Sequence, residues 1–257
     1  MQDKNVMDET RFAEIDIVRG VAVILMIIYH ALFDLDMMEL TDLRINQGPL
    51  KLLARATAGT FFTIVGLSLY ISFSRNKRRI SEGFTHSRKY LIRGGKLVAW
   101  GAVITGVTYF LYPEFVVLFG ALHFIGVSIV LGYFLLELTH GLRRGFRLFY
   151  LSIILIALFF LTDPVRGSQL DHYFLLWLGV VPSAFKSLDY FPLIPWFGYV
   201  VGGLILGELL YPGGNRRYDI SEVKNRPMEF MGRHSLVIYF LHQPLLYLGI
   251  FLFTVLS

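Results

Sequence analysis

The sequence predicts an all-α fold, a polytopic bundle of about seven transmembrane helices. Of its 257 residues 55% are hydrophobic and only 17% charged, and the mean hydropathy is +0.58, well above that of a soluble domain. Apolar runs long enough for an α-helix to cross ~30 Å of hydrocarbon recur along the chain. These runs are continuous, as at 151–161, whereas the strands of a membrane barrel would alternate. We therefore expect one transmembrane domain over 1–257.

Composition excludes several other classes of protein. The chain has no cysteine, so a disulfide, a thiolate metal site and a cysteine nucleophile are excluded. The net charge of +5 is explained by basic loops that face anionic headgroups, so we expect membrane lipids and not nucleic acid as partners. The first apolar run follows charges of both signs and lacks a small-residue cleavage site, which predicts a retained first helix.

Seven apolar segments are long enough to span the membrane, and an eighth is too short. The expected spans are 17–37, 56–74, 94–112, 115–137, 147–162, 194–211 and 235–256. The segment 173–185 has thirteen residues, which would reach only ~20 Å as a helix, and Pro182 lies near its end. It is predicted to form a short re-entrant or interfacial helix.

The distribution of lysine and arginine selects the topology, because these residues concentrate on the cytoplasmic side. With seven spans and a cytoplasmic N-terminus, 19 basic residues are inside and 5 outside, whereas counting 173–185 as a span gives 15 and 9. The seven-span topology is therefore predicted. The inner residues are Lys4, Arg11, Arg19, Arg75, Lys77, Arg78, Arg79, Arg88, Lys89, Arg93, Lys96, Arg143, Arg144, Arg147, Arg216, Arg217, Lys224, Arg226 and Arg233, and the outer ones are Arg44, Lys51, Arg55, Arg166 and Lys186.

Ionisable side chains line one face of the first helix, although each costs roughly 3 kcal/mol at the bilayer centre. Arg19 and His30 are eleven residues apart, so they share a face ~16 Å apart along the axis, and Asp16 and Asp34 extend it. A carboxylate one turn from an imidazole orients a general base, so His30 and Asp34 are catalytic candidates. Asp16 and Arg19 are substrate-binding candidates. The alternative is an Asp16–Arg19 pair that anchors the helix end, with His30 bonded to a backbone carbonyl.

Two further histidines lie within predicted spans. His123, between Gly120 and Gly126, is a third catalytic candidate or a structural residue beside close-packed helices. His242 is followed two residues later by Pro244, which opens the helical backbone. We expect His242 either to bind substrate or to satisfy that opened backbone.

Three charged residues outside the first helix are substrate-binding candidates. Asp189 lies at the outer mouth of the sixth span, where it could bind a polar acceptor. Arg93 and Lys96 lie at the inner side, where they could bind a phosphorylated donor or lipid headgroups.

Three sequence patterns resemble known enzymes. The segment Glu14-Ile-Asp16-Ile-Val-Arg19-Gly20 with Tyr29-His30 resembles the arginine, ten residues, histidine motif of the membrane acyltransferase superfamily. The segment from Gly232 to Pro244 is similar to the superfamily's last-helix pattern. The short length and the segment 189–196 look most like the heparan-alpha-glucosaminide N-acetyltransferase catalytic-domain family.

The resemblance implies transfer of an acyl group, acetyl above all, from cytoplasmic acyl-coenzyme A to a sugar, amine or hydroxyl acceptor, with no metal. The sequence departs from the lysosomal members, which carry asparagine at the position of His30 and an outer-loop histidine that 38–55 lacks. The resemblance therefore does not imply glucosamine as the acceptor, and it extends the catalytic role to His30 alone. A multi-pass protein of the cell membrane is expected, with the oligomeric state open, a homo-oligomer included. The alternatives are a transporter or lipid-handling protein whose histidines relay protons, and a structural scaffold.

The predicted topology is testable with reporter fusions after residues 85 and 220. Because the basic residues near both positions favour the inner side, both fusions should report cytoplasm. A cytoplasmic signal at the first and an external signal at the second would rule out the seven-span topology.

Overall fold

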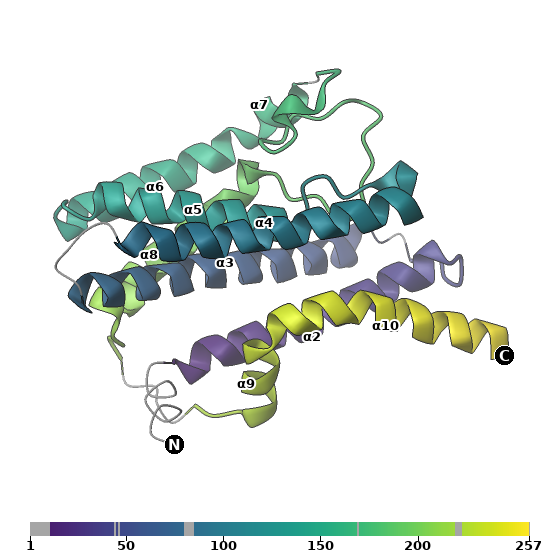
Figure 1. The fold of residues 1–257 in the computed structure, drawn as a ribbon, viewed down its shortest axis with the longest axis horizontal. Coiled ribbons are helices and arrows are strands. Elements are labelled where there is room, and N and C mark those ends of the chain that lie inside the picture. The colour runs from purple at the N-terminus through teal and green to yellow at the C-terminus, as the bar shows by residue number, and fades with distance from the viewer. Residues whose placement is uncertain are drawn as a thin grey trace. The chain divides into compact units, whose positions relative to one another are not determined.

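The computed structural model describes residues 11–43, 45, 47–79, 85–168, 170–218 and 223–256, and within these ranges the regular elements are helices without a strand (Figure 1). Seven of the described helical segments are long and apolar enough to cross a membrane, which confirms the predicted fold class and indicates a multi-pass membrane protein. Lys4 and Arg44 lie outside the described residues, as do the side chains of Arg78 and Arg79. The elements are α2 Ala13–Met37, α3 Gly48–Arg79, α4 Thr85–Leu111, η1 Pro113–Phe115, α5 Ala121–Thr139, α6 Arg144–Phe160, α7 Thr162–Gly167, η2 Tyr173–Leu175, α8 Leu193–Leu210, η3 Pro212–Gly214, α9 Arg226–Arg233 and α10 Ser235–Leu256.

The helix ends differ from the predicted spans where polar residues continue a helix or an irregular turn delays it. α3 begins at Gly48, eight residues before the apolar run, with Pro49 at a position that suits a helix start. α4 begins nine residues early, at Thr85, because its basic first turns are helical without being apolar. α5 begins late, at Ala121, because the 3₁₀ helix η1 and an irregular stretch precede it.

The segment 173–185 is not among the seven helices long and apolar enough to span a membrane, but the short helix predicted for it is wrong. It contains the single 3₁₀ turn η2, followed by turns and irregular backbone, rather than a continuous thirteen-residue helix. Hydrogen bonds from Leu193 N–H to the Trp177 carbonyl and from Ile194 N–H to the Leu178 carbonyl tie it to the start of α8. These bonds replace the helical partners that Pro182 would interrupt.

The chain divides into two compact units, with a boundary inside α3. One unit contains residues 1–61 and 219–257, and we call it the terminal unit. The other contains residues 62–218, and we call it the central unit. The expectation of a single domain over 1–257 stays a prediction.

In the terminal unit α2 packs against both α9 and α10, and the short α9 turns sharply away from α10 (Figure 1). α9 begins with a reciprocal cap: the Asn225 side chain accepts a hydrogen bond from Met228 N–H, and Glu229 accepts one from Asn225 N–H. A Cβ on Gly20 would collide with the Met228 carbonyl, and a Cβ on Gly232 with the Asp16 carbonyl. Glycine at these two positions therefore permits the close approach of α2 and α9.

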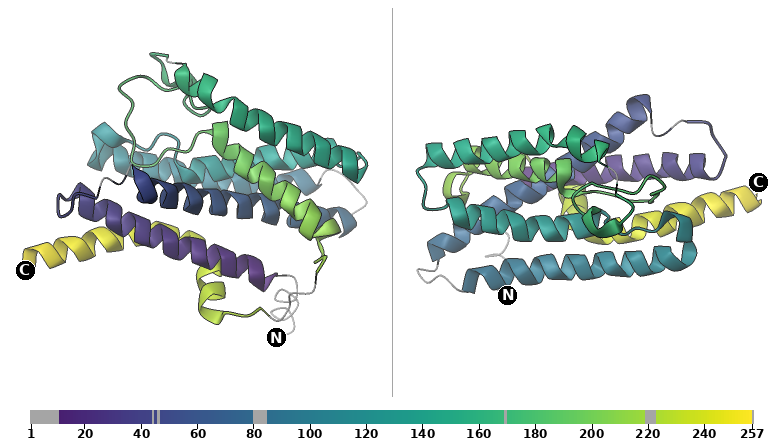
Figure 2. Two further views of the ribbon diagram at one scale, coloured as in Figure 1. Left: turned by 180° about the vertical axis from the view of Figure 1, so that it is seen from behind. Right: turned by 90° about the horizontal axis from the view of Figure 1, so that it is seen from above.

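In the central unit α4 lies beside α5, and α8 packs against α6 (Figures 1 and 2). Val200, Val201 and Leu204 of α8 are fully buried, and a Cβ on Gly203 would collide with the Thr63 carbonyl of α3. Small residues let helices approach in this way, as expected in a membrane, where packing rather than hydrophobic burial drives association. The core of the central unit therefore surrounds α8.

A buried carboxylate fastens α8 to the start of α6. Glu208 is 2% exposed, and its two oxygens lie 2.9 Å from Nη2 and 2.8 Å from Nε of Arg147. Arg144 adds an ion pair at 3.4 Å and donates to the Glu208 carbonyl. A charge buried in an apolar protein requires such partners, so we assign this cluster a structural role.

The packing of α2 on α9 predicts the effect of a single methyl group. Gly232→Ala should lower the free energy of unfolding by about 1–3 kcal/mol, because the new Cβ must displace the Asp16 backbone. Gly249→Ala in α10 is the matched control, since a Cβ there meets nothing within 4 Å. Unfolding titrations of both variants in mixed micelles provide the measurement, and equal stabilities would contradict the close approach.

Candidate active site

An ionic cluster of Asp16, Arg19, Glu229 and Arg233 lies where α2 meets α9. Asp16 is 5% exposed, and its Oδ1 lies 2.6 Å from Nη1 of Arg19. Nε of Arg233 lies 3.5 Å from the other oxygen of Asp16, and Nη2 of Arg233 donates to Glu229 at 3.3 Å. Asp16 therefore holds two guanidinium groups from different helices at one place.

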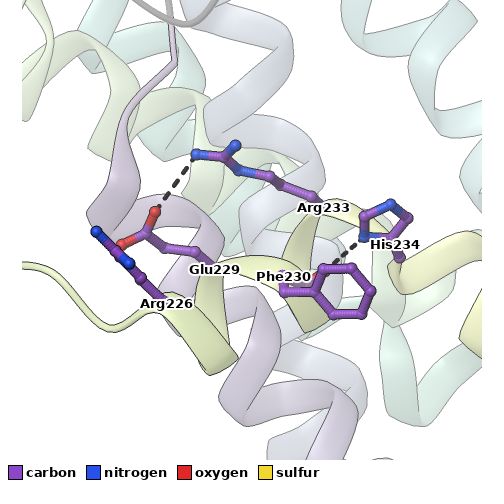
Figure 3. A pocket seen from close by; sticks show the side chains of 5 residues that line it. All are labelled: Arg226, Glu229, Phe230, Arg233 and His234. Carbon is purple, nitrogen blue, oxygen red and sulfur yellow. Dashed lines mark hydrogen bonds and ion pairs between the residues drawn. The ribbon is translucent and has the colours of Figure 1, made fainter.

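Beside this cluster lies an open pocket of about 370 Å³, lined by Arg226, Glu229, Phe230, Arg233 and His234. Figure 3 shows the guanidinium groups of Arg226 and Arg233 near the Glu229 carboxylate, and the Phe230 ring beside His234. The ring centroids of Phe230 and His234 are 4.3 Å apart, and Nδ1 of His234 donates to the Phe230 carbonyl at 2.8 Å. The pocket thus combines cationic side chains with an exposed aromatic ring, features that suit a planar, anionic ligand.

Two imidazole rings meet between α2 and α10. The ring centroids of His30 and His242 are 4.8 Å apart in an edge-to-face arrangement. Nδ1 of His30 lies 2.9 Å from the Met26 carbonyl, and Nδ1 of His242 lies 2.7 Å from the Tyr239 carbonyl. Because a carbonyl only accepts, each Nδ1 carries the proton, and Nε2 of a neutral ring has a free lone pair. Both rings are therefore held in the tautomer that a general base at Nε2 requires.

One turn along α2 from His30, Asp34 is bonded to α10. Its Oδ1 accepts a hydrogen bond of 2.6 Å from Nε2 of Gln243, and the residue is 3% exposed. Three atoms near this bond are buried without a hydrogen-bond partner among the described residues: Asp34 Oδ2, His242 Nε2 and Gln243 Oε1. The terminal unit therefore brings His30, Asp34 and His242 together and adds Gln243.

The geometry differs from the predicted role of Asp34. Asp34 holds Gln243, while the Met26 carbonyl holds His30, so the tautomer of His30 is set by the backbone of α2. This bond and the Asp16–Arg19 ion pair are the contacts of the structural alternative. The Met26 bond uses only Nδ1 of His30, and Arg19 belongs to the ionic cluster that adjoins the pocket. His30 therefore stays a candidate general base, and Arg19 a candidate for binding substrate.

His123 belongs to the central unit, on α5. Its ring is stacked on Phe119 at 5.9 Å and faces Gly101 of α4, where a Cβ would lie 2.7 Å from Nδ1. That Nδ1 is buried and has no hydrogen-bond partner in the described part of the chain. Glycine at position 101 thus makes room for the imidazole, and the catalytic role of His123 stays a prediction.

Arg93 and Lys96 also belong to the central unit, where both are exposed on α4. They are three residues apart and so lie on neighbouring positions of one helix face. Their joint action with Arg19 on a donor stays a prediction.

Asp189 caps α5 from a loop of the central unit. Its Oδ2 accepts a hydrogen bond of 2.8 Å from the Ala121 N–H, at the first turn of α5. Leu188 and Phe191 N–H groups donate to the Phe115 and Phe119 carbonyls on either side. Burial raises the pKa of the Tyr190 hydroxyl, which donates to the Leu176 carbonyl. The geometry therefore gives Asp189 a structural role, and the binding of an acceptor by Asp189 stays a prediction.

A comparison with protein families shows which family the sequence matches. The chain matches the family described as heparan-alpha-glucosaminide N-acetyltransferase, catalytic, over residues 11–244. This match includes the ionic cluster, the histidine pair and the whole central unit. The chain belongs to this family. Comparisons with curated proteins and with solved structures gave no match.

Membership in the heparan-alpha-glucosaminide N-acetyltransferase catalytic family confirms the resemblance and supports a membrane acetyltransferase in general. Acetyltransferases of this family use acetyl-coenzyme A as donor in general. Among the described residues, no group of three or more metal-ligating side chains is close enough to hold a metal ion.

Sequence analysis did not single out the pocket residues of α9, nor Gln243 of α10, as site candidates. Gln243 lies between His242 and Pro244. A side-chain amide in an apolar span indicates a hydrogen bond to a neighbouring helix, so the sequence could have pointed to this residue. Arg233 was included only among the inner basic residues. The neighbouring Gly232, which permits contact with Asp16, could have indicated its position.

The cap of α5 yields a test of Asp189. Asp189→Asn should keep the cap, because an amide oxygen also accepts the Ala121 N–H, whereas Asp189→Ala should lower the free energy of unfolding by about 0.5–2 kcal/mol. Thermal unfolding in detergent measures the difference. Equal stability of the two variants, with acetyl transfer lost in both, would instead favour binding of an acceptor.

Proposed function

We propose that the protein transfers an acetyl group from acetyl-coenzyme A to an amine or hydroxyl acceptor, such as a sugar, with His30 as the general base. The observation that carries the proposal is the tautomer of His30: its Nδ1 donates to Met26, which leaves Nε2 to accept a proton. A transporter needs no fixed tautomer, so this geometry favours the enzyme.

The donor binds at the other end of α2. Arg19 and Arg233 converge on Asp16, and Arg226 lines the adjoining pocket, so guanidinium groups are ready to pair with the phosphates of coenzyme A. The exposed Phe230 ring offers a surface on which the adenine stacks. In the proposed topology this end faces the cytoplasm, and Arg93 and Lys96 of the central unit remain separate candidates for binding phosphates.

The thioester then reaches His30 along α2. Arg19 and His30 are eleven residues apart on one helix, which corresponds to ~16 Å along its axis. The flexible arm of the donor extends over this distance from the cytoplasmic side. The acceptor enters from the opposite end of α2, so that the acetyl group crosses most of the cell membrane.

The chemistry is a single acyl transfer. Nε2 of His30 takes the proton of the acceptor O–H or N–H while the oxygen or nitrogen bonds to the thioester carbonyl carbon. The tetrahedral intermediate collapses, the C–S bond breaks, and the leaving thiolate takes up the proton from the imidazolium. The products are the acetylated acceptor and free coenzyme A.

Replacement of His30 tests this mechanism. His30→Ala should fold, since an apolar residue costs nothing in a lipid-embedded helix, and it should bind acetyl-coenzyme A normally because the ionic cluster is ~16 Å away. Acetyl transfer should fall by roughly 100-fold or more. Single-turnover transfer and donor binding are measured on the same preparations.

The matched control is His172→Ala, the same change at an exposed position of the central unit. It should transfer acetyl groups like the wild type. If His30→Ala also transfers acetyl groups at the wild-type rate, His30 is structural and His123 is the next residue to replace.

A further inference from the structure

Three buried hydrogen-bond acceptors without a donor belong to residues at the contact of α2 with α10, near His30. Asp34 is 3% and His242 7% exposed, and neither Asp34 Oδ2 nor His242 Nε2 has a partner among the described residues. Gln243 Oε1, from the residue after His242 on α10, is also buried without a partner among the described residues. Buried polar atoms in folded proteins are almost always paired, so three such atoms on residues of one helix contact require an explanation.

The existing hydrogen bonds fix two of these atoms as acceptors, and the third is an oxygen of the Asp34 carboxylate. Gln243 uses its Nε2 to donate to Asp34, so its oxygen is the atom that remains. His242 donates from Nδ1 to the Tyr239 and Ile238 carbonyls, so Nε2 carries a lone pair. Asp34 contributes its second carboxyl oxygen. A ligand that satisfies this set must therefore bring hydrogen-bond donors, and more than one of them.

We propose that Asp34, His242 and Gln243 form the acceptor-binding subsite, and that it selects molecules with at least two O–H or N–H donors over those with one. The inference rests on the proposed function, because one of these donors gives its proton to His30. The ring of His242 lies 4.8 Å from that of His30, centroid to centroid, so a ligand bound to His242 also reaches the general base.

The position along α2 suits an acceptor that enters from water. Asp34 lies three residues before the end of α2 at Met37, and Arg19 lies toward the other end. In the proposed reaction, acetyl-coenzyme A and the molecule that receives the acetyl group therefore approach the histidine pair from opposite ends of the helix. Gln243 acts as a positioning residue: it holds Asp34 with its amide nitrogen and presents its oxygen to the ligand.

The subsite can be tested without acetyl transfer, by comparing the binding of a ligand that has several hydrogen-bond donors with that of a ligand that has one. The protein in detergent, with ¹⁵N-labelled histidine, is titrated with glucosamine and with cyclohexanol, a six-membered ring that carries a single O–H donor. Glucosamine should shift the His242 Nε2 resonance saturably, because a donor now bonds to it, and cyclohexanol should not. His242→Phe assigns the resonance, and the exposed His172 is the internal reference.

A variant pair tests Gln243. Gln243→Leu should weaken glucosamine binding about tenfold, the scale of one lost hydrogen bond between polar groups, without changing acetyl-coenzyme A binding. Gln47→Leu, the same change at an exposed position, should bind both ligands like the wild type. Unchanged glucosamine affinity in Gln243→Leu would remove Gln243 from the subsite, and a variant that fails to fold leaves the wild-type titration to decide.

The outcomes separate this inference from the proposed function. If acetyl-coenzyme A binds but glucosamine and cyclohexanol both fail to shift His242, or shift it equally, the three atoms are satisfied by water and the subsite is wrong. If glucosamine alone shifts His242 but acetyl-coenzyme A does not bind, the subsite stands and the acetyltransferase does not.

Discussion

Hydrocarbon offers no hydrogen-bonding partner, and the placement of every polar group in this chain follows from that fact. The backbone satisfies itself in helices, and most buried charges have opposite charges beside them. Asp16 is held by two guanidinium groups and Glu208 by another two. Several buried polar atoms of the described residues depart from this rule, Nδ1 of His123 among them, and three belong to Asp34, His242 and Gln243 at the contact of α2 with α10 near His30. A region that the protein leaves unsatisfied is where a polar ligand gains most by binding.

Close helix contact has a functional as well as a structural role. Without a side chain, Gly20 and Gly232 let the backbones of α2 and α9 meet, and this contact brings Arg233 to Asp16. Gly101 similarly admits the ring of His123 on α5. Membrane helices are commonly joined through small residues, and here those residues also decide which ionisable side chains become neighbours.

The fold class and the number of spans were predictable from sequence because hydropathy and helix length are local properties. The spacing of Arg19 and His30 was equally readable, since both lie on α2 and one helix fixes their faces. The partners of these residues were not predictable. Gln243 is 209 residues from Asp34 in the chain, and only the packing of α10 on α2 brings them together. Asp189 was predicted to bind an acceptor, but its cap on Ala121, 68 residues away, depends on a loop conformation that no periodicity encodes.

The helix α2 has a further consequence for motion. It runs without proline or interruption over 25 residues, so the distance between its arginine and its histidine is set by an unbroken ladder of backbone hydrogen bonds. Such a rod tilts or shifts as a whole but does not stretch. Any conformational change must therefore occur in what surrounds α2, such as the α9–α10 corner, while the axial distance between Arg19 and His30 stays constant.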